Sequence, residues 1–258
     1  MEQFPSTADP TKEEIAVIEL RQRISDVILV DEKFDDDFYL LQWLKAQTLN
    51  PSKAEDMIRK STKWRQELNI HSNLAKEFSP EFIKDFVVPF SKTKEGVPVA
   101  YFHAGKMDFK AGLITCGKSR WIQYWGMVYT QMEEQMIAFN KAQNTNETGR
   151  LTSDSICGIV GLVDAQDFSS MQLLDSDVLS CAVVNIKNLA NYFPAIAATF
   201  VFYNMNPFFS TLFNAFKPFL TWPNLSLEVY GTDEKIWRER VLKIVHLADL
   251  NELESYWK

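Results

Sequence analysis

The sequence contains few of the residues that build metal centres and disulfide frameworks. Its 258 residues include three cysteines and three histidines. Cys116, Cys157 and Cys181 are widely spaced and form no CxxC pair, which predicts free thiols in a reducing compartment. The histidines are too few and too scattered to indicate a metal site. We therefore predict no disulfide, no metal and no cofactor.

Excess positive charge and long apolar runs are also missing. The formal net charge is −7 and the isoelectric point is near 5.1, which argues against nucleic-acid binding and against a polybasic membrane patch. No run of 18 apolar residues exists, so no membrane-spanning helix is expected. Met1–Asp9 is polar and differs from a signal peptide. These absences predict a cytoplasmic protein.

Common catalytic motifs are absent. The sequence has no GxSxG elbow, no HExxH pair and no Cys-x5-Arg phosphate loop. His103 has no activated nucleophile near it in the sequence, and Asp164 is expected to cap a strand end. Glu133 and Glu134 are interpreted as a solvated helix face. We therefore predict that the protein is not an enzyme.

One motif supports an alternative. Gly112–Ser119 matches the P-loop pattern GxxxxGK[ST], and Ile159–Asp164 resembles the strand that ends in a magnesium-binding aspartate. A P-loop follows a buried strand, because its backbone N–H groups must wrap the phosphates. Here the preceding segment, Lys106–Ala111, is charged and unlike a strand. We expect a loop followed by a helix, and keep a nucleotide-binding enzyme as the alternative hypothesis.

Aromatic residues are abundant at 13%, with 19 phenylalanines. The richest segment is Pro207–Leu220, which predicts a short amphipathic helix that begins at Pro207 and ends near Pro218. Each phenylalanine contributes roughly 1.5–3 kcal/mol when it leaves water. Such a face must cover a core, a pocket or a membrane. The residues we assign to it as a gate are Phe208, Phe209, Leu212, Phe213 and Phe216.

Helical signals dominate the first seventy residues. Thr11 and Glu14 form a capping box before a pattern that runs to about Val30. Asn50 and Pro51 provide a cap and a first helical residue. The expected helices are 11–30, 35–47, 50–68 and a further one from Ser79.

After about residue 75 the apolar period alternates between strand and helix. Strands are expected at 97–102, 156–163, 199–203 and 226–230, and helices at 118–141, 175–189 and 237–245. This alternation predicts an α/β fold with a mostly parallel sheet. We predict two domains, a helical bundle over 1–75 and an α/β domain over 76–258.

Read together, several segments resemble the CRAL-TRIO family of lipid-binding and lipid-transfer proteins. The resemblance covers nearly the whole chain from about residue 12, and its weight comes from the order and spacing of the motifs. The matching segments are Asp37–Ala46, Lys53–Ile58, Lys63–Arg65, Gly96–Val99, Ile159–Asp164, Asn191–Pro194, Asn206–Phe208, Phe216–Leu220 and Ser226–Gly231.

The resemblance implies a small N-terminal helical bundle and an α/β domain whose sheet and flanking helices enclose an apolar lipid pocket. The Phe-rich helix would be the mobile gate, which closes on the ligand in water and enters the interface at a membrane. Transient membrane contact follows, whereas protein partners stay unknown.

Three positions depart from the phosphoinositide-transferring branch of the family. Gln47, Ala195 and Ser226 stand where that branch carries an arginine, a glutamate and a lysine. A phospholipid headgroup buried without counter-charges is costly. We therefore predict an apolar ligand with at most one polar end, such as a retinoid, tocopherol, carotenoid, sterol or other isoprenoid.

Candidate pocket residues follow from helical and strand spacing. Tyr101, Tyr124 and Tyr129 are candidates to anchor a ligand hydroxyl or carbonyl. We expect about half of the candidates to line a cavity and the rest to be plain core. The predicted ligand-binding residues are Tyr101, Trp121, Tyr124, Trp125, Val128, Tyr129, Met132, Ile159, Gly161, Val163, Phe200 and Phe202.

The function that the sequence favours is a carrier of one hydrophobic small molecule that exchanges its ligand at membranes. The alternatives are the nucleotide-binding enzyme that uses Gly112–Ser119, a phospholipid transfer protein, and a scaffold with a structural lipid.

Overall fold

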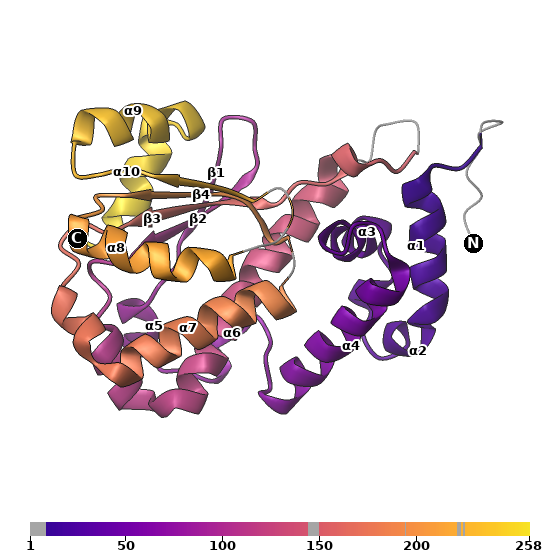
Figure 1. Cartoon of the computed structure of the whole chain (residues 1–258), viewed down its shortest axis with the longest axis horizontal. Helices are drawn as coiled ribbons and strands as arrows, with labels where there is room; N and C mark the ends of the chain where they lie inside the picture. The colour runs from indigo at the N-terminus through magenta and orange to yellow at the C-terminus, as the bar shows by residue number, and fades with distance from the viewer. Residues whose placement is uncertain (1–8, 144–149, 194, 221–222, 224) are drawn as a thin grey trace.

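The computed structural model describes residues 9–143, 150–193, 195–220, 223 and 225–258 (Figure 1). Its first part is a group of helices on one side of the molecule. They are α1 (Lys12–Arg23), α2 (Ser25–Ile28), η1 (Glu32–Phe34), α3 (Asp37–Ala46), α4 (Pro51–Glu67) and η2 (Leu74–Lys76).

The predicted caps of these helices are confirmed. Thr11 accepts from the backbone of Glu14 in a complete capping box, and Asn50 caps α4 with Pro51 at its first position. The single helix expected to Val30 is wrong, because the backbone leaves helical geometry at Ile24. This turn lets α1 and α2 both bury side chains in one core, with Ile24 itself fully buried.

The second part is built on one five-stranded sheet in the order β1-β2-β3-β4-β5. β1 (Phe90–Lys92) is antiparallel to β2 (Pro98–His103), and the other neighbours are parallel. The remaining strands are β3 (Ile159–Asp164), β4 (Ala197–Tyr203) and β5 (Ser226–Val229). The expected α/β class with a mostly parallel sheet is confirmed.

Helices cover both faces of the sheet (Figure 1). On one face lie α6 (Phe109–Gln143), α7 (Ser176–Tyr192) and α8 (Pro207–Phe216), and on the other lie α9 (Glu234–Ile244) and α10 (Leu247–Ser255). The connecting pieces are α5 (Pro80–Asp85), η3 (Ser153–Ser155), η4 (Ser170–Leu174) and η5 (Lys217–Phe219).

The P-loop-like segment has the wrong conformation for a phosphate cradle. Residues 112–119 belong to α6, with one non-helical residue, Gly117, at φ 76°. Gly117 is a kink at which one helix ends and the next begins, so residues 112–116 are helical and do not form the loop that cradles a phosphate. The Lys118 ammonium lies 2.7 Å from a carboxylate oxygen of Asp177. The expected loop is therefore wrong, whereas the helix expected from Lys118 begins at this kink.

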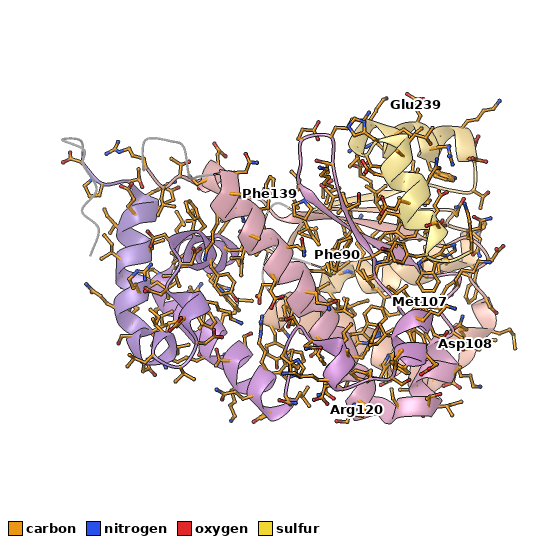
Figure 2. The ribbon with its side chains drawn as sticks, turned by 180° about the vertical axis from the view of Figure 1, so that it is seen from behind. Phe90, Met107, Asp108, Arg120, Phe139 and Glu239 are labelled. Carbon is orange, nitrogen blue, oxygen red and sulfur yellow. The ribbon has the colours of Figure 1, made fainter. Side chains whose placement is uncertain are left out.

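A buried ion pair joins the N-terminal helices to α6. Arg65 of α4 contacts Glu133 of α6 at 2.6 Å, and the Tyr39 hydroxyl donates to Glu133 at 2.8 Å. Glu133 is 3% exposed, so its interpretation as part of a solvated face is wrong. Its neighbour Glu134 is exposed, as expected. Figure 2 shows α6 running from the region of Arg120 to Phe139, beside the N-terminal helices.

Candidate functional site: an apolar cavity between the sheet and three helices

A cavity of about 250 Å³ lies between the sheet and α6, α7 and α8. Each of these elements turns an apolar face towards it. The lining residues are Phe102, Ala104, Met107, Phe109, Trp121, Trp125, Tyr129, Met132, Val163, Phe168, Val178, Ala182, Asn185, Ile186, Leu189, Phe200, Phe202, Phe209, Phe213, Phe216 and Leu220.

Ten of the residues singled out from the sequence lie on this wall. They come from the long helix, the two central strands and the Phe-rich helix, as the spacing predicted. They are Trp121, Trp125, Tyr129, Met132, Val163, Phe200, Phe202, Phe209, Phe213 and Phe216. Their role in ligand binding stays a prediction.

Strand alternation moves Tyr101 away from the cavity. Successive strand residues point to opposite faces, and in β2 it is Phe102 that lines the cavity. Tyr101 is fully buried on the other face, where its hydroxyl donates to Asp164 at 3.3 Å. Tyr101 therefore does not line the cavity.

Four other candidates are core residues. The Tyr124 hydroxyl donates to the Phe86 carbonyl at 2.8 Å, on a side of α6 that faces away from the cavity. Val128 and Ile159 are buried in the surrounding hydrophobic cluster. Gly161 shares the inward face of β3 with Val163, but the ring of Phe200 covers it.

The gate candidates divide between the inside and the outside of α8. The ring centroids of Phe213 and Phe202 lie 4.4 Å apart, and those of Phe209 and Phe168 lie 4.5 Å apart. Phe208 is 45% exposed and does not line the cavity. The side chain of Leu212 lies outside the described residues.

The sequence interpretation missed the wall that α7 provides. Val178, Ala182, Asn185 and Leu189 recur at three- and four-residue intervals and all line the cavity. This amphipathic period was visible in the sequence. Met107, Phe168 and Leu220 come from connecting segments, where no period identifies a buried side chain.

The wall is almost free of polar groups. No described lining residue carries a carboxylate, ammonium, guanidinium or imidazole group. Asn185 contributes an amide, Tyr129 a hydroxyl, and Trp121 and Trp125 an indole N–H group each. Burial raises the pKa of Tyr129, so its hydroxyl stays protonated at neutral pH. The cavity is suited to an apolar molecule with few polar atoms.

The base of the gate helix is held by hydrogen bonds at the carboxyl ends of the central strands. Asn206 caps α8 by accepting from the Phe209 N–H at 2.8 Å. Two residues earlier, the Asn204 amide donates to Asp164 at 2.8 Å. Asp164 also accepts from the Gln166 backbone, so the capping role predicted for it is confirmed.

Three positions depart from the phosphoinositide-binding pattern: Gln47, Ala195 and Ser226. Their side chains are uncharged, and the structure shows where each of them lies. The Gln47 amide nitrogen lies 3.0 Å from the Met57 sulfur. Ala195 is buried with a positive φ of 53°, and Ser226 is exposed at the start of β5. None of them lines the cavity.

Sheet and covering helices together enclose an apolar cavity, which is the arrangement that the comparisons with known proteins bear on. A family model described as the CRAL/TRIO domain matches residues 82–225, which is more than half of the chain. The chain therefore belongs to the CRAL/TRIO family. Family and fold support a lipid-binding transfer protein.

The chain is also similar to a curated protein and to a solved structure. It is 31% identical over 87 residues to the CRAL-TRIO domain-containing protein T23G5.2 of Caenorhabditis elegans. That match covers 33% of this chain and 12% of the relative's length. The crystal structure of Sfh5 is similar with a TM-score of 0.61 at 15% identity, covering 90% of this chain and 85% of that one. This second likeness shows the fold.

No described helix is long and apolar enough to cross a membrane. Likewise, no group of three or more His, Cys, Asp or Glu residues in the described part of the chain is arranged to hold a metal ion. All three cysteines are free thiols.

Proposed function

We propose that this protein is a carrier that holds one isoprenoid-like molecule in the cavity and exchanges it at membranes. The observation that carries this proposal is the chemistry of the wall: twenty-one lining residues without one charged side chain among those described. Retinoids, tocopherols, carotenoids and sterols share the required property, which is a large apolar body with at most one polar end.

The same wall disfavours a phospholipid. A phosphate group that leaves water needs counter-charges and hydrogen-bond donors, or its burial costs several kcal/mol, on the order of the penalty for any isolated ion. Gln47, Ala195 and Ser226 supply no positive charge. A phosphoinositide headgroup would have to stay in solvent.

The size of the cavity also favours a ligand with one hydrocarbon body over a phospholipid with two acyl chains. The volume of about 250 Å³ lies just below the roughly 300–1,000 Å³ typical of small-molecule sites. A larger isoprenoid therefore requires α8 or α7 to move outwards. Because α8 contributes Phe209, Phe213 and Phe216 to the wall, its displacement is the direct way to enlarge the cavity.

The gate helix is suited to open at a membrane. In water, opening exposes the buried ring of Phe213, which is 5% accessible in the closed form. A lipid surface stabilises the open form, because the same rings can enter its interface. Phe208 is already 45% exposed and would make the first contact.

The first test is to purify the protein without detergent and identify co-purifying molecules by organic extraction and mass spectrometry, after recording an absorption spectrum. One stoichiometric isoprenoid is the expected result. Stoichiometric phosphatidylinositol would contradict the proposed ligand class. An isoprenoid that never transfers between vesicles would instead identify a structural lipid.

The second test separates carrier from nucleotide enzyme. Phe213→Asp should slow ligand transfer between vesicles by tenfold or more, because a buried charge under the gate disturbs both its closed and membrane-bound forms (roughly 1.4 kcal/mol per tenfold). Lys118→Ala is the control, since it removes only an exposed ion pair with Asp177. An unchanged rate in Phe213→Asp would contradict the gate role, and loss of nucleotide binding in Lys118→Ala would revive the enzyme alternative.

A further inference from the structure

We propose that Asn185 selects the ligand, and that the ligand is a lipid alcohol whose hydroxyl donates a hydrogen bond to the Asn185 Oδ1 atom. The inference rests on the proposed carrier function, since it names the ligand class of the same cavity. Asn185 is the one polar side chain among the described residues of α7 that line the cavity.

Asn185 lies in the middle turns of α7. The residues one turn before and after it, Ala182 and Leu189, line the same cavity, as does its neighbour Ile186. Helical period therefore directs position 185 to an apolar wall. An asparagine there is unfavourable for a helix that merely packs on a core, because a buried amide needs partners.

The amide lacks such a partner. Asn185 is 8% exposed, and its Oδ1 is buried without a hydrogen bond to any described residue. Buried polar atoms in folded proteins are nearly always hydrogen-bonded. An unpaired acceptor on the wall of a ligand cavity is therefore the place where a ligand donor binds.

The unpaired atom is an acceptor, and this fixes the chemistry of the ligand end. A hydroxyl can donate to it, whereas an ether, an ester or a hydrocarbon cannot. A carboxylate cannot donate either, and no described lining residue supplies a cation for it. The Tyr129 hydroxyl can donate as well as accept, and the Trp121 and Trp125 indole N–H groups donate, so none of them requires a ligand donor as the unpaired Oδ1 atom of Asn185 does.

The test compares three probes of one chain length by titration calorimetry: farnesol, its methyl ether and the saturated hydrocarbon farnesane. The wild-type protein should bind farnesol at least tenfold more tightly than the ether. In Asn185→Leu this preference should disappear, through weaker binding of farnesol with little change for the ether. The melting temperature of the ligand-free variant should not fall, because leucine has the same branched shape, can extend into the adjoining cavity and leaves no polar atom unpaired.

Asn188→Leu is the matched control. It makes the same substitution on α7 at a residue that does not line the cavity, so the ratio of farnesol to ether affinity should stay at the wild-type value. If Asn185→Leu folds poorly, Asn185→Ala removes the amide without adding bulk and should abolish the same preference.

Failure of the inference differs from failure of the proposed function. Equal affinities for farnesol and its ether in the wild-type protein, or a preference that survives in Asn185→Leu, would overturn the role of Asn185 and leave the carrier function standing. Absence of binding to all three probes by the wild-type protein would overturn both.

Discussion

The two faces of the sheet are covered in different ways although the same strands build both. Towards α9 and α10, Tyr101, Leu162, Val201 and Tyr203 are all fully buried. Towards α6, α7 and α8, alternate residues such as Phe102 and Val163 remain partly accessible, because a cavity lies between them and the helices. Both faces are apolar, and the cavity-facing side of β3 also includes Gly161. The cavity therefore does not depend on polar strand residues, and it lies between the strands and the covering helices.

The helices that cover the cavity need stabilising contacts on the side that faces away from the sheet. α6 cannot rest fully on the sheet where the cavity lies, so contacts on its outer side fix its position. The Arg65–Glu133 pair and the Tyr39 hydroxyl bond provide such contacts from α4 and α3. By contrast, α9 packs Trp237 directly on Tyr203, with ring centroids 4.5 Å apart.

Removing the ion pair that supports α6 should have the largest effect on the free energy of unfolding. Glu133→Gln leaves the Arg65 guanidinium buried without its counter-charge, and should lower the free energy of unfolding by about 3–5 kcal/mol. Urea denaturation followed by circular dichroism measures this loss. Glu134→Gln, at the exposed neighbouring position, should change it by less than about 0.5 kcal/mol. Equal, small effects would show that α6 is held by packing alone.

Acidification should weaken the same support. Burial by itself would raise the pKa of Glu133, but the charges of Arg65 and Lys33 and the hydrogen bonds from Arg65 and Tyr39 together outweigh it and hold the pKa below the ordinary 4.5. The unfolded chain then binds a proton at higher pH than the folded one, so the stabilisation is complete above about pH 4.5 and is lost as pH falls through the folded-state pKa. The stability difference between wild type and Glu133→Gln should shrink between pH 5 and pH 3. A constant difference would contradict this assignment.

A matched pair of valines tests the difference between the faces directly. Val201→Ala, on the filled face, should cost about 2 kcal/mol for two lost methyl groups and the space they leave. Val163→Ala, on the cavity wall, should cost less than about 1 kcal/mol, because its side chain already borders empty space. Denaturant midpoints at equal m-values compare the two. Equal losses would mean that both faces are equally filled.

The smallest expected effect on stability is at Phe208, outside the gate. Phe208→Ser should change the free energy of unfolding by less than about 0.5 kcal/mol, since the ring is largely exposed. Ligand transfer to vesicles should nevertheless slow, because the first apolar contact with the membrane is removed. An unchanged transfer rate at unchanged stability would assign membrane contact to another surface.

Local signals explain which parts of the fold could be predicted. Helix-start signals act within a few residues, so Thr11, Asn50 and Pro207 marked their helices correctly. α10 was missed because the residue before it, His246, makes no side-chain cap. β1 has three residues, which is too short to show a period.

Non-local effects explain the errors at the candidate site. β2 presents aromatic residues on both faces, so its sequence does not indicate whether Tyr101 or Phe102 faces the ligand. Glu133 looked like its exposed neighbour, because its partner Arg65 is distant in the sequence. The apolar period of α7 is visible in the sequence, but it does not indicate that the face with Asn185 borders a cavity rather than a packed core.

Gly161 gives the cavity a control point that touches no ligand. A methyl group at this position would lie 2.2 Å from the Phe200 ring, so the ring would have to turn. Because Phe200 lines the cavity, a methyl group added at Gly161 would change the shape of the cavity. Gly161→Ala should therefore reshape the cavity from a position that does not itself line it.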